Sequence, residues 1–142
     1  MKKHFTIKSV LIALLVMISC TMKATIFKYI TDDGFTYSLN SETLKATLAK
    51  YSGDATEMVI PESVVYWGQA FKVTGLGYKC FSDCSSLTSV EIPSFVTSLE
   101  SGCLAGCSSL ESIVVDADNP KYDSREGCNA IIETASNTMI AG

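Results

Sequence analysis

Two consecutive stretches of the chain repeat one pattern of apolar and polar positions. They cover residues 76–92 and 99–115, so that position 76 corresponds to position 99 at an offset of 23, and each ends in the spacing L-x-x-L-x-L. Alternate side chains of an extended strand face the same side, so Val90 and Ile92 are expected to point inward and Glu91 outward. A fixed period of this length predicts stacked coils with one short strand each.

A weaker copy lies upstream, where Met58 and Ile60 precede Pro61. Its offset to the next copy is 32 rather than 23, so about nine extra residues precede Leu76. Within them, the segment 66–71 (YWGQAF) is interpreted either as an exposed aromatic contact or as a hairpin packed against the N-terminal part of the chain.

The region before the repeats carries no copy of the pattern. Residues 26–30 and 35–39 predict two strands joined by an Asp-Gly turn. Leu44 and Leu48 alternate with polar residues and predict a third strand, although a helix beginning near Asn40 has the same spacing. A strand meander is favoured, because a stack of coils needs a cap over its first open coil.

Several motifs of the repeats recur in phase: IPS at 92–94, VTSL at 96–99, CSSLTSV at 84–90 and AGCSSL at 105–110. With these motifs the region from about 55 to 142 resembles the BspA-type leucine-rich repeats of bacterial surface proteins. The tail Asp118-Asn119-Pro120-x-Tyr122 resembles a variant unit of that family. The chain departs from the family in placing Cys80 and Cys103 where Ala is more frequent.

The fold class expected from the repeats and the resemblance is a β-rich leucine-rich-repeat solenoid of short stacked coils with an N-terminal β-meander cap. Its expected divisions are a signal peptide (1–24), the cap (25–54) and the repeats (55–142). In the variant last coil, residues 131–134 and 138–141 predict a hairpin. That coil is interpreted as open or truncated, and an open strand edge predicts self-association.

The segment 1–24 has the features of an export signal. Lys2 and Lys3 precede an uninterrupted apolar run, 10–18, which is too short for a bilayer span of roughly 20 residues. Cleavage near Ala24 is one interpretation, and acylation of Cys20 in a lipoprotein-like box is another. A retained signal anchor is a third. The predicted location is extracellular or at the cell surface, with a lipid anchor if Cys20 is acylated.

The charge of the chain bears on its partners. The formal net charge is −4, and removal of residues 1–24 takes away four lysines and no acid, which leaves seven basic against fifteen acidic residues, or −8. An acidic exported chain has no electrostatic attraction for nucleic acid or anionic lipid. A protein partner is therefore expected.

Catalysis is not expected, and no cofactor is predicted. The only histidine is His4, which lies in the predicted signal peptide, so His-dependent triads and His-metal sites are excluded from the processed chain.

Four cysteines recur at the structural period. Cys80 and Cys84 correspond to Cys103 and Cys107 at the same offset that relates the two copies. A ladder of small buried side chains is one interpretation, disulfides between them are a second, and a four-thiolate zinc site is a third. Cys128 is the cysteine most expected to be unpaired.

The acidic stretch 116–120, with Asp123, hints at a calcium loop. An EF-hand loop requires Gly at its sixth position and Glu at its twelfth, where this chain has Lys121 and Gly127. A polar turn whose side chains bond to their own backbone is the simpler interpretation.

The outward side of the predicted repeat strands is the candidate partner-binding face. Its residues are Thr56, Glu57, Val59, Thr88, Ser89, Glu91, Glu111, Ser112 and Val114. If their coils are neighbours, Glu57 and Glu91 are expected to form an acidic column. An ordinary solvated strand face is the alternative.

Three functional hypotheses follow. The first, which the resemblance implies, is a non-enzymatic secreted or surface protein that adheres to host matrix or cell-surface proteins. The second is a structural spacer or a fragment of a larger surface array, and the third is a zinc-binding module.

Overall fold

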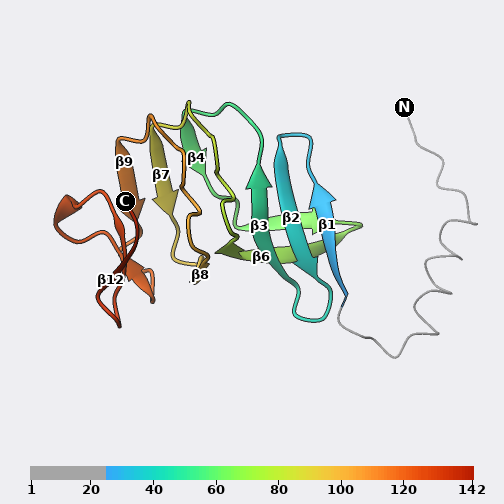
Figure 1. The fold of residues 1–142 in the computed structure, drawn as a ribbon. Coiled ribbons are helices and arrows are strands. Elements are labelled where there is room, and N and C mark those ends of the chain that lie inside the picture. Colours follow the sequence, from blue (N-terminus) through green and yellow to red (C-terminus); the bar gives the residue numbers. More distant parts are fainter. Residues whose placement is uncertain (1–24) are drawn as a thin grey trace, which may run out of the picture.

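The protein is described here by a computed structural model, in which residues 25–142 are placed (Figure 1). The predicted signal peptide, Cys20 and His4 lie outside the described residues. The described chain folds into three β-sheets and one short 3-10 helix, η1 (Arg125–Gly127). The strands are β1 (Ile26–Ile30), β2 (Phe35–Asn40), β3 (Lys45–Tyr51), β4 (Glu57–Val59), β5 (Ser63–Tyr66), β6 (Gln69–Leu76), β7 (Ser89–Ile92), β8 (Ser98–Leu99), β9 (Ser112–Val115), β10 (Tyr122–Asp123), β11 (Ile131–Glu133) and β12 (Thr138–Ala141).

The first three strands form an antiparallel meander, as the alternation predicts. Residues 40–44 form a turn rather than the start of a helix. The Asn40 side-chain oxygen accepts the backbone N–H groups of Glu42 and Thr43, each at 3.0 Å, but Leu44 then adopts a positive φ of 53°, which ends the turn. Leu44 is consequently exposed and does not join the inward row of β3, contrary to the prediction for that residue.

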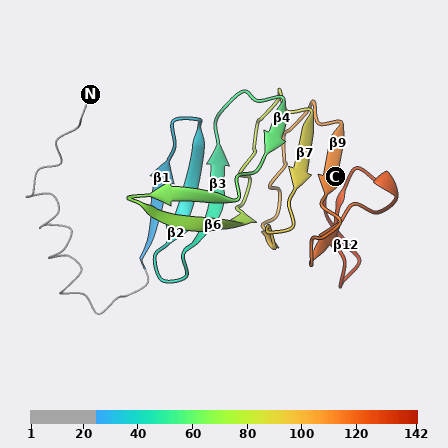
Figure 2. The same ribbon diagram turned by 180° about the vertical axis from the view of Figure 1, so that it is seen from behind.

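The extra residues of the first repeat form the β5–β6 hairpin, which crosses the meander in both views (Figures 1 and 2). Its two-residue turn, Trp67-Gly68, has φ values of 50° and 79°, the left-handed geometry that suits strand twist in tight hairpins. The Tyr66 ring packs 5.1 Å from the rings of both Phe27 and Tyr29. Trp67 is 77% exposed, so the hairpin is packed at its body and exposed at its tip.

The repeat strands pair side by side in a parallel sheet with the order β4-β7-β9. Met58 lies opposite Val90, and Val90 lies opposite Ile113, so the structure keeps both offsets seen in the sequence, 32 and 23. All three side chains are buried. The predicted period therefore describes the actual pairing of this sheet.

A second parallel ladder links the same repeats. β6 pairs with β8, with Leu76 opposite Leu99, which is the same offset as in the first ladder. Gly75 belongs to this close approach, because a Cβ there would lie 3.2 Å from the Ser98 carbonyl oxygen. Successive repeats are thus joined at two separate places.

The meander continues the stack on its N-terminal side. The Tyr51 N–H donates to the Cys80 carbonyl at 2.7 Å, and the Gly77 N–H donates to the Leu48 carbonyl at 2.8 Å. β3 also pairs in parallel with β6. The meander therefore offers the first repeat the same type of backbone contact that one repeat offers the next.

The C-terminal segment forms the predicted hairpin from β11 and β12, with a bulge between Ile131 and Ile132. The two-residue strand β10, which the sequence pattern does not predict, adds to β11.

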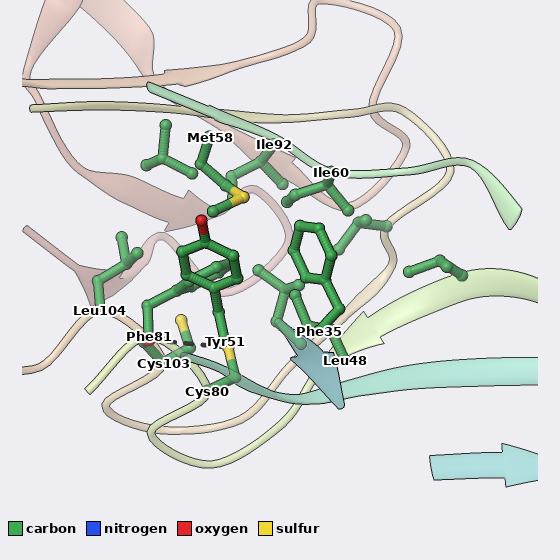
Figure 3. Close-up of a cluster of buried hydrophobic side chains, with 14 of the residues drawn as sticks. Phe35, Leu48, Tyr51, Met58, Ile60, Cys80, Phe81, Ile92, Cys103 and Leu104 are labelled. Atoms are coloured by element: carbon green, nitrogen blue, oxygen red, sulfur yellow. Dashed lines mark hydrogen bonds between the residues drawn. The ribbon is translucent and has the colours of Figure 1, made fainter. Parts of the chain in front are cut away.

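One hydrophobic core runs through the meander and the repeats. Figure 3 shows part of it, with contributions from Phe35, Leu48, Tyr51, Met58, Ile60, Cys80, Phe81, Ile92, Cys103 and Leu104.

Equivalent repeat positions differ in burial, and this difference gives a prediction. Leu87 is fully buried, whereas its counterpart Leu110 is only partly buried. Leu87→Ala is expected to lower the free energy of unfolding by about 2–5 kcal/mol, the range for truncation of a buried leucine. Leu110→Ala should lower the free energy of unfolding by clearly less, because part of the Leu110 side chain already contacts water. Urea denaturation followed by circular dichroism measures both, and equal losses would contradict the assigned burial.

Candidate binding surface

The candidate face is the outward side of the β4-β7-β9 sheet. Side chains alternate along each strand, so Met58, Val90 and Ile113 enter the core and their neighbours point to solvent. Thr88 and Ser89 are half-buried. The remaining predicted face residues are exposed, namely Thr56, Glu57, Val59, Glu91, Glu111, Ser112 and Val114.

The strand register arranges this face into rows that run across the sheet. Glu57 lies opposite Ser89, which lies opposite Ser112. Val59 lies opposite Glu91, which lies opposite Val114. Just before the strands, Thr56, Thr88 and Glu111 also lie side by side, because the Thr88 N–H donates to Thr56 and the Glu111 N–H donates to Thr88.

The predicted acidic column of Glu57 and Glu91 is wrong. The two residues belong to different rows, because the register of β4 against β7 places Glu57 beside Ser89. Glu91 instead lies between two valines. The face therefore presents a row with one carboxylate between apolar groups, rather than a stripe of like charges.

A shallow hollow of about 310 Å³ lies between the Glu57 row and the Val59 row. Met58 and Val90 also line it, while their side chains stay buried in the core. Val59 is 82% exposed and Val114 is 48% exposed. Within residues 25–142, neither Glu57 nor Glu91 forms an ion pair, so both carboxylates are available to a partner.

The four periodic cysteines form a stacked arrangement with free thiols. Cys80 and Cys103 are fully buried, and the Cys80 thiol donates to the Cys103 carbonyl at 3.7 Å (Figure 3). The Cys107 thiol donates to the Phe81 carbonyl at 3.2 Å. This arrangement matches the buried-ladder interpretation.

Burial also lowers the reactivity expected of these thiols. It raises the pKa of Cys107 to about 11, and it raises the pKa of Cys80 and Cys103 as well. In the part of the chain that the structure describes, no three His, Cys, Asp or Glu side chains gather closely enough to hold a metal ion. The zinc hypothesis thus has no ligand set among these residues.

The acidic turn after β9 bonds to its own backbone. Asp116 accepts the Asp118 N–H at 2.8 Å, and Asn119 accepts the N–H groups of Lys121 and Tyr122 at 3.0 and 2.9 Å. Asp116 and Asn119 thus use side-chain oxygens to bond the backbone of the turn, as the polar-turn interpretation expects.

Asp123 belongs to a hydrogen-bond network that the repeat pattern of the sequence does not predict. Its carboxylate accepts hydrogen bonds from the Arg125 guanidinium, at 2.7 and 2.8 Å, and from the Thr134 hydroxyl at 2.9 Å. Arg125 also donates to the Asn137 side chain at 2.7 Å. The Arg125 bonds, followed by the Thr134 bond, lower the pKa of Asp123 to about 2. The Asp-x-Arg spacing was the only signal of this network in the sequence.

A family profile matches these repeats. The BspA type leucine rich repeat region matches residues 56–130 in six copies. The chain belongs to the BspA-type leucine-rich-repeat family. Leucine-rich-repeat proteins of this kind are generally non-enzymatic binding modules, and their domains commonly mediate protein interaction. BspA-type proteins are typically bacterial surface proteins.

Solved structures support the same family. A leucine rich cell surface protein from Faecalibacterium prausnitzii matches 68% of this BspA-type chain at 30% identity with a TM-score of 0.57, and 25% of its own length is covered. A leucine-rich repeat protein from Bacteroides capillosus matches 61% of the chain at 28% identity with a TM-score of 0.56, and 64% of its length is covered. The chain therefore spans a quarter of the first relative and under two thirds of the second.

A leucine-rich repeat protein from Bacteroides ovatus shares the fold, at 24% identity and a TM-score of 0.56 over 65% of the chain and 24% of its own length. No curated protein sequence matches the chain. Among the described residues of this BspA-type chain, no helix has the length and apolar character needed to cross a membrane.

The cysteine arrangement predicts an order of alkylation. Cys128 is exposed and should react with iodoacetamide at pH 8 in the folded protein. Cys107 should react slowly, because a pKa of about 11 leaves roughly one thiolate in a thousand at that pH. Cys80 and Cys103 should react only in denaturant. Peptide mass spectrometry reads each site, and native labelling of Cys80 at the rate of Cys128 would contradict the buried ladder.

The Asp123 network predicts a pH dependence of stability. Because the folded-state pKa of Asp123 is depressed, its contribution is present above an unfolded-state pKa of about 4. It should be lost as the pH falls toward 2. Asp123→Asn is therefore expected to flatten the stability profile between about pH 4 and pH 2.

Asp118→Asn is the matched control for this measurement. It makes the same charge change nearby, where the carboxylate forms no hydrogen bond or ion pair within residues 25–142. Thermal unfolding at stepped pH compares the variants, and identical acid slopes for wild type and Asp123→Asn would refute the assignment.

Proposed function

We propose that this protein is an exported, non-enzymatic leucine-rich-repeat solenoid that binds another protein through the outward face of its β4-β7-β9 sheet. The two parallel ladders, which share one period, support the solenoid. The family membership supports a protein-binding or surface role. Residues 1–24 act as the signal peptide in this proposal, with acylation of Cys20 as the route to a membrane-anchored form.

The proposed cap is the meander of residues 25–54, followed by repeats over 55–142. Bonds from Tyr51 to Cys80 and from Gly77 to Leu48 support this division, because they join the meander to the first repeat. The β5–β6 hairpin belongs to the same sheet as the meander. In this proposal, the meander and the hairpin together cover the N-terminal side of the first repeat.

The observation that carries the binding proposal is the row of Val59, Glu91 and Val114 beside the hollow. Exposed valine side chains gain free energy when a partner removes them from water. Together with an unpaired carboxylate, they suit a partner that offers an apolar surface and a basic group. The net charge of −8 over residues 25–142 favours the same partner. Host matrix proteins and other cell-surface proteins are the proposed class, and nucleic acid is not.

A second proposed role is that of a structural spacer or a piece of a surface array that associates with itself. β12 supports it, because it lies at the outer edge of the β10-β11-β12 sheet and its Met139 is 68% exposed. An exposed strand edge can pair with another chain.

A binding assay on the mature chain tests the main proposal. The variant Val59→Ser/Glu91→Gln/Val114→Ser changes one row of the face and is expected to weaken binding to an immobilised panel of purified extracellular-matrix proteins at least tenfold, or about 1.4 kcal/mol. Surface plasmon resonance gives the affinities.

Val65→Ser is the matched control, because Val65 is also exposed but lies on β5, outside the face. Binding that survives the triple change intact would refute the assignment of the face. Absence of binding by the wild type, together with concentration-dependent self-association in sedimentation velocity, would favour the spacer role.

A further inference from the structure

The outer edge of β9 is the end of the parallel sheet, and its backbone donors need partners. Ser112 and Asp116 donate their N–H groups to Thr88 and Ile92 on the β7 side, at 3.0 and 3.0 Å. Because N–H groups alternate in direction along a strand, those of Ile113 and Val115 point away from β7. An edge with such free donors is a template for pairing with another chain.

Two side chains from the following segment occupy these donors. Asn129 Oδ1 accepts the Ile113 N–H at 2.5 Å, and Ser124 Oγ accepts the Val115 N–H at 3.0 Å. No backbone strand pairs with β9 on this side within the described chain.

Local structure holds both acceptors in place. Ser124 lies between Asp123 and Arg125, whose side chains are bonded to each other. Asn129 follows η1 with a φ of 51°, a left-handed conformation that asparagine adopts more readily than most residues. The buried side chain of Ile131 anchors the segment just beyond it.

The second ladder ends in the same way. Glu100 donates to Leu76 on the β6 side, so the Leu99 N–H points outward, and the Tyr122 hydroxyl accepts it at 3.1 Å. The Asn119 amide donates to the carbonyls of Pro93 and Val96 at 2.8 and 2.9 Å.

The spacing of these bonds follows the repeat. Tyr122 lies 23 residues after Leu99, and Asn119 lies 23 residues after Val96. The segment that holds Asn119 and Tyr122 thus occupies the place of the next repeat. It bonds to the preceding repeat through side chains, whereas a repeat would use its backbone.

We infer that Asn119, Tyr122, Ser124 and Asn129 form an edge clamp, which closes both parallel ladders and prevents another chain from adding a strand at β9. A side-chain acceptor satisfies a donor without presenting a new row of backbone groups. The clamp therefore stops the ladder, whereas another strand would extend it.

Amide hydrogen exchange by NMR tests the clamp on the mature chain. In Ser124→Ala/Asn129→Ala, the amides of Ile113 and Val115 should exchange at least tenfold faster. Those of Ser112 and Asp116, which bond to β7, should keep their protection and so report that the sheet is still folded. Unchanged exchange at Ile113 and Val115 would overturn the inference.

Conservative variants separate the clamp from general damage to the fold. Asn129→Asp keeps a side-chain acceptor and should retain slow exchange at Ile113. Tyr122→Phe removes only a hydroxyl from a buried ring and should accelerate exchange at Leu99 alone. Ser136→Ala, which removes a bond to Glu133 in the β11–β12 turn, should leave all three amides unchanged. Fast exchange at Ile113 in Asn129→Asp as well as Asn129→Ala would count against a role for the acceptor.

Sedimentation velocity over increasing concentration tests the consequence for association. The double alanine variant should form larger species at a concentration at least tenfold below that required by wild type or Ser136→Ala. Faster edge exchange without this change in association would overturn the protective role.

Discussion

The parallel pairing of one repeat with the next is the interaction on which the rest of this structure depends. A single repeat exposes backbone groups on both sides and buries few side chains, so it gains stability only through its neighbours. Two ladders, one through β7 and β9 and one through β6 and β8, fix the neighbours at the same offset. Once that offset is set, the inward residues meet in one core and the outward residues fall into rows.

The segments on the two sides of the described repeats meet them by different means. At the N-terminal end, β3 pairs with β6 through the backbone, and the hairpin of β5 and β6 packs its aromatic residues on the meander. At the other end, the polar side chains of Ser124 and Asn129 take the places of backbone acceptors. The ladder of β6 and β8 is thereby continued by β3 on one side, and the outward donors of β9 are bonded by side chains on the other.

Periodicity was sufficient to predict the repeat strands, because every inward position of β7 and β9 carries an apolar residue at a constant offset. It was also sufficient for the meander, where alternation from Phe35 onward matched the burial. Leu44 escaped prediction because a single left-handed residue in a turn removes it from the alternating row. β10 escaped because so short a strand cannot show a period.

The candidate face was predictable residue by residue but not as an arrangement, since the neighbours of Glu91 depend on the register between strands. The Asp123 network and the contacts of Asn129 depend on turns, which leave no periodic pattern in a sequence.

The equivalence of the stacking contacts has a consequence for how such proteins change in evolution. Each repeat presents the same ladder geometry on its two sides, so the duplication of one repeat unit within the stack would leave the contacts of the meander and of the C-terminal segment intact. It would lengthen the outward face by one strand, or about 4.8 Å. Gene duplication can therefore adjust the reach of this surface in discrete steps.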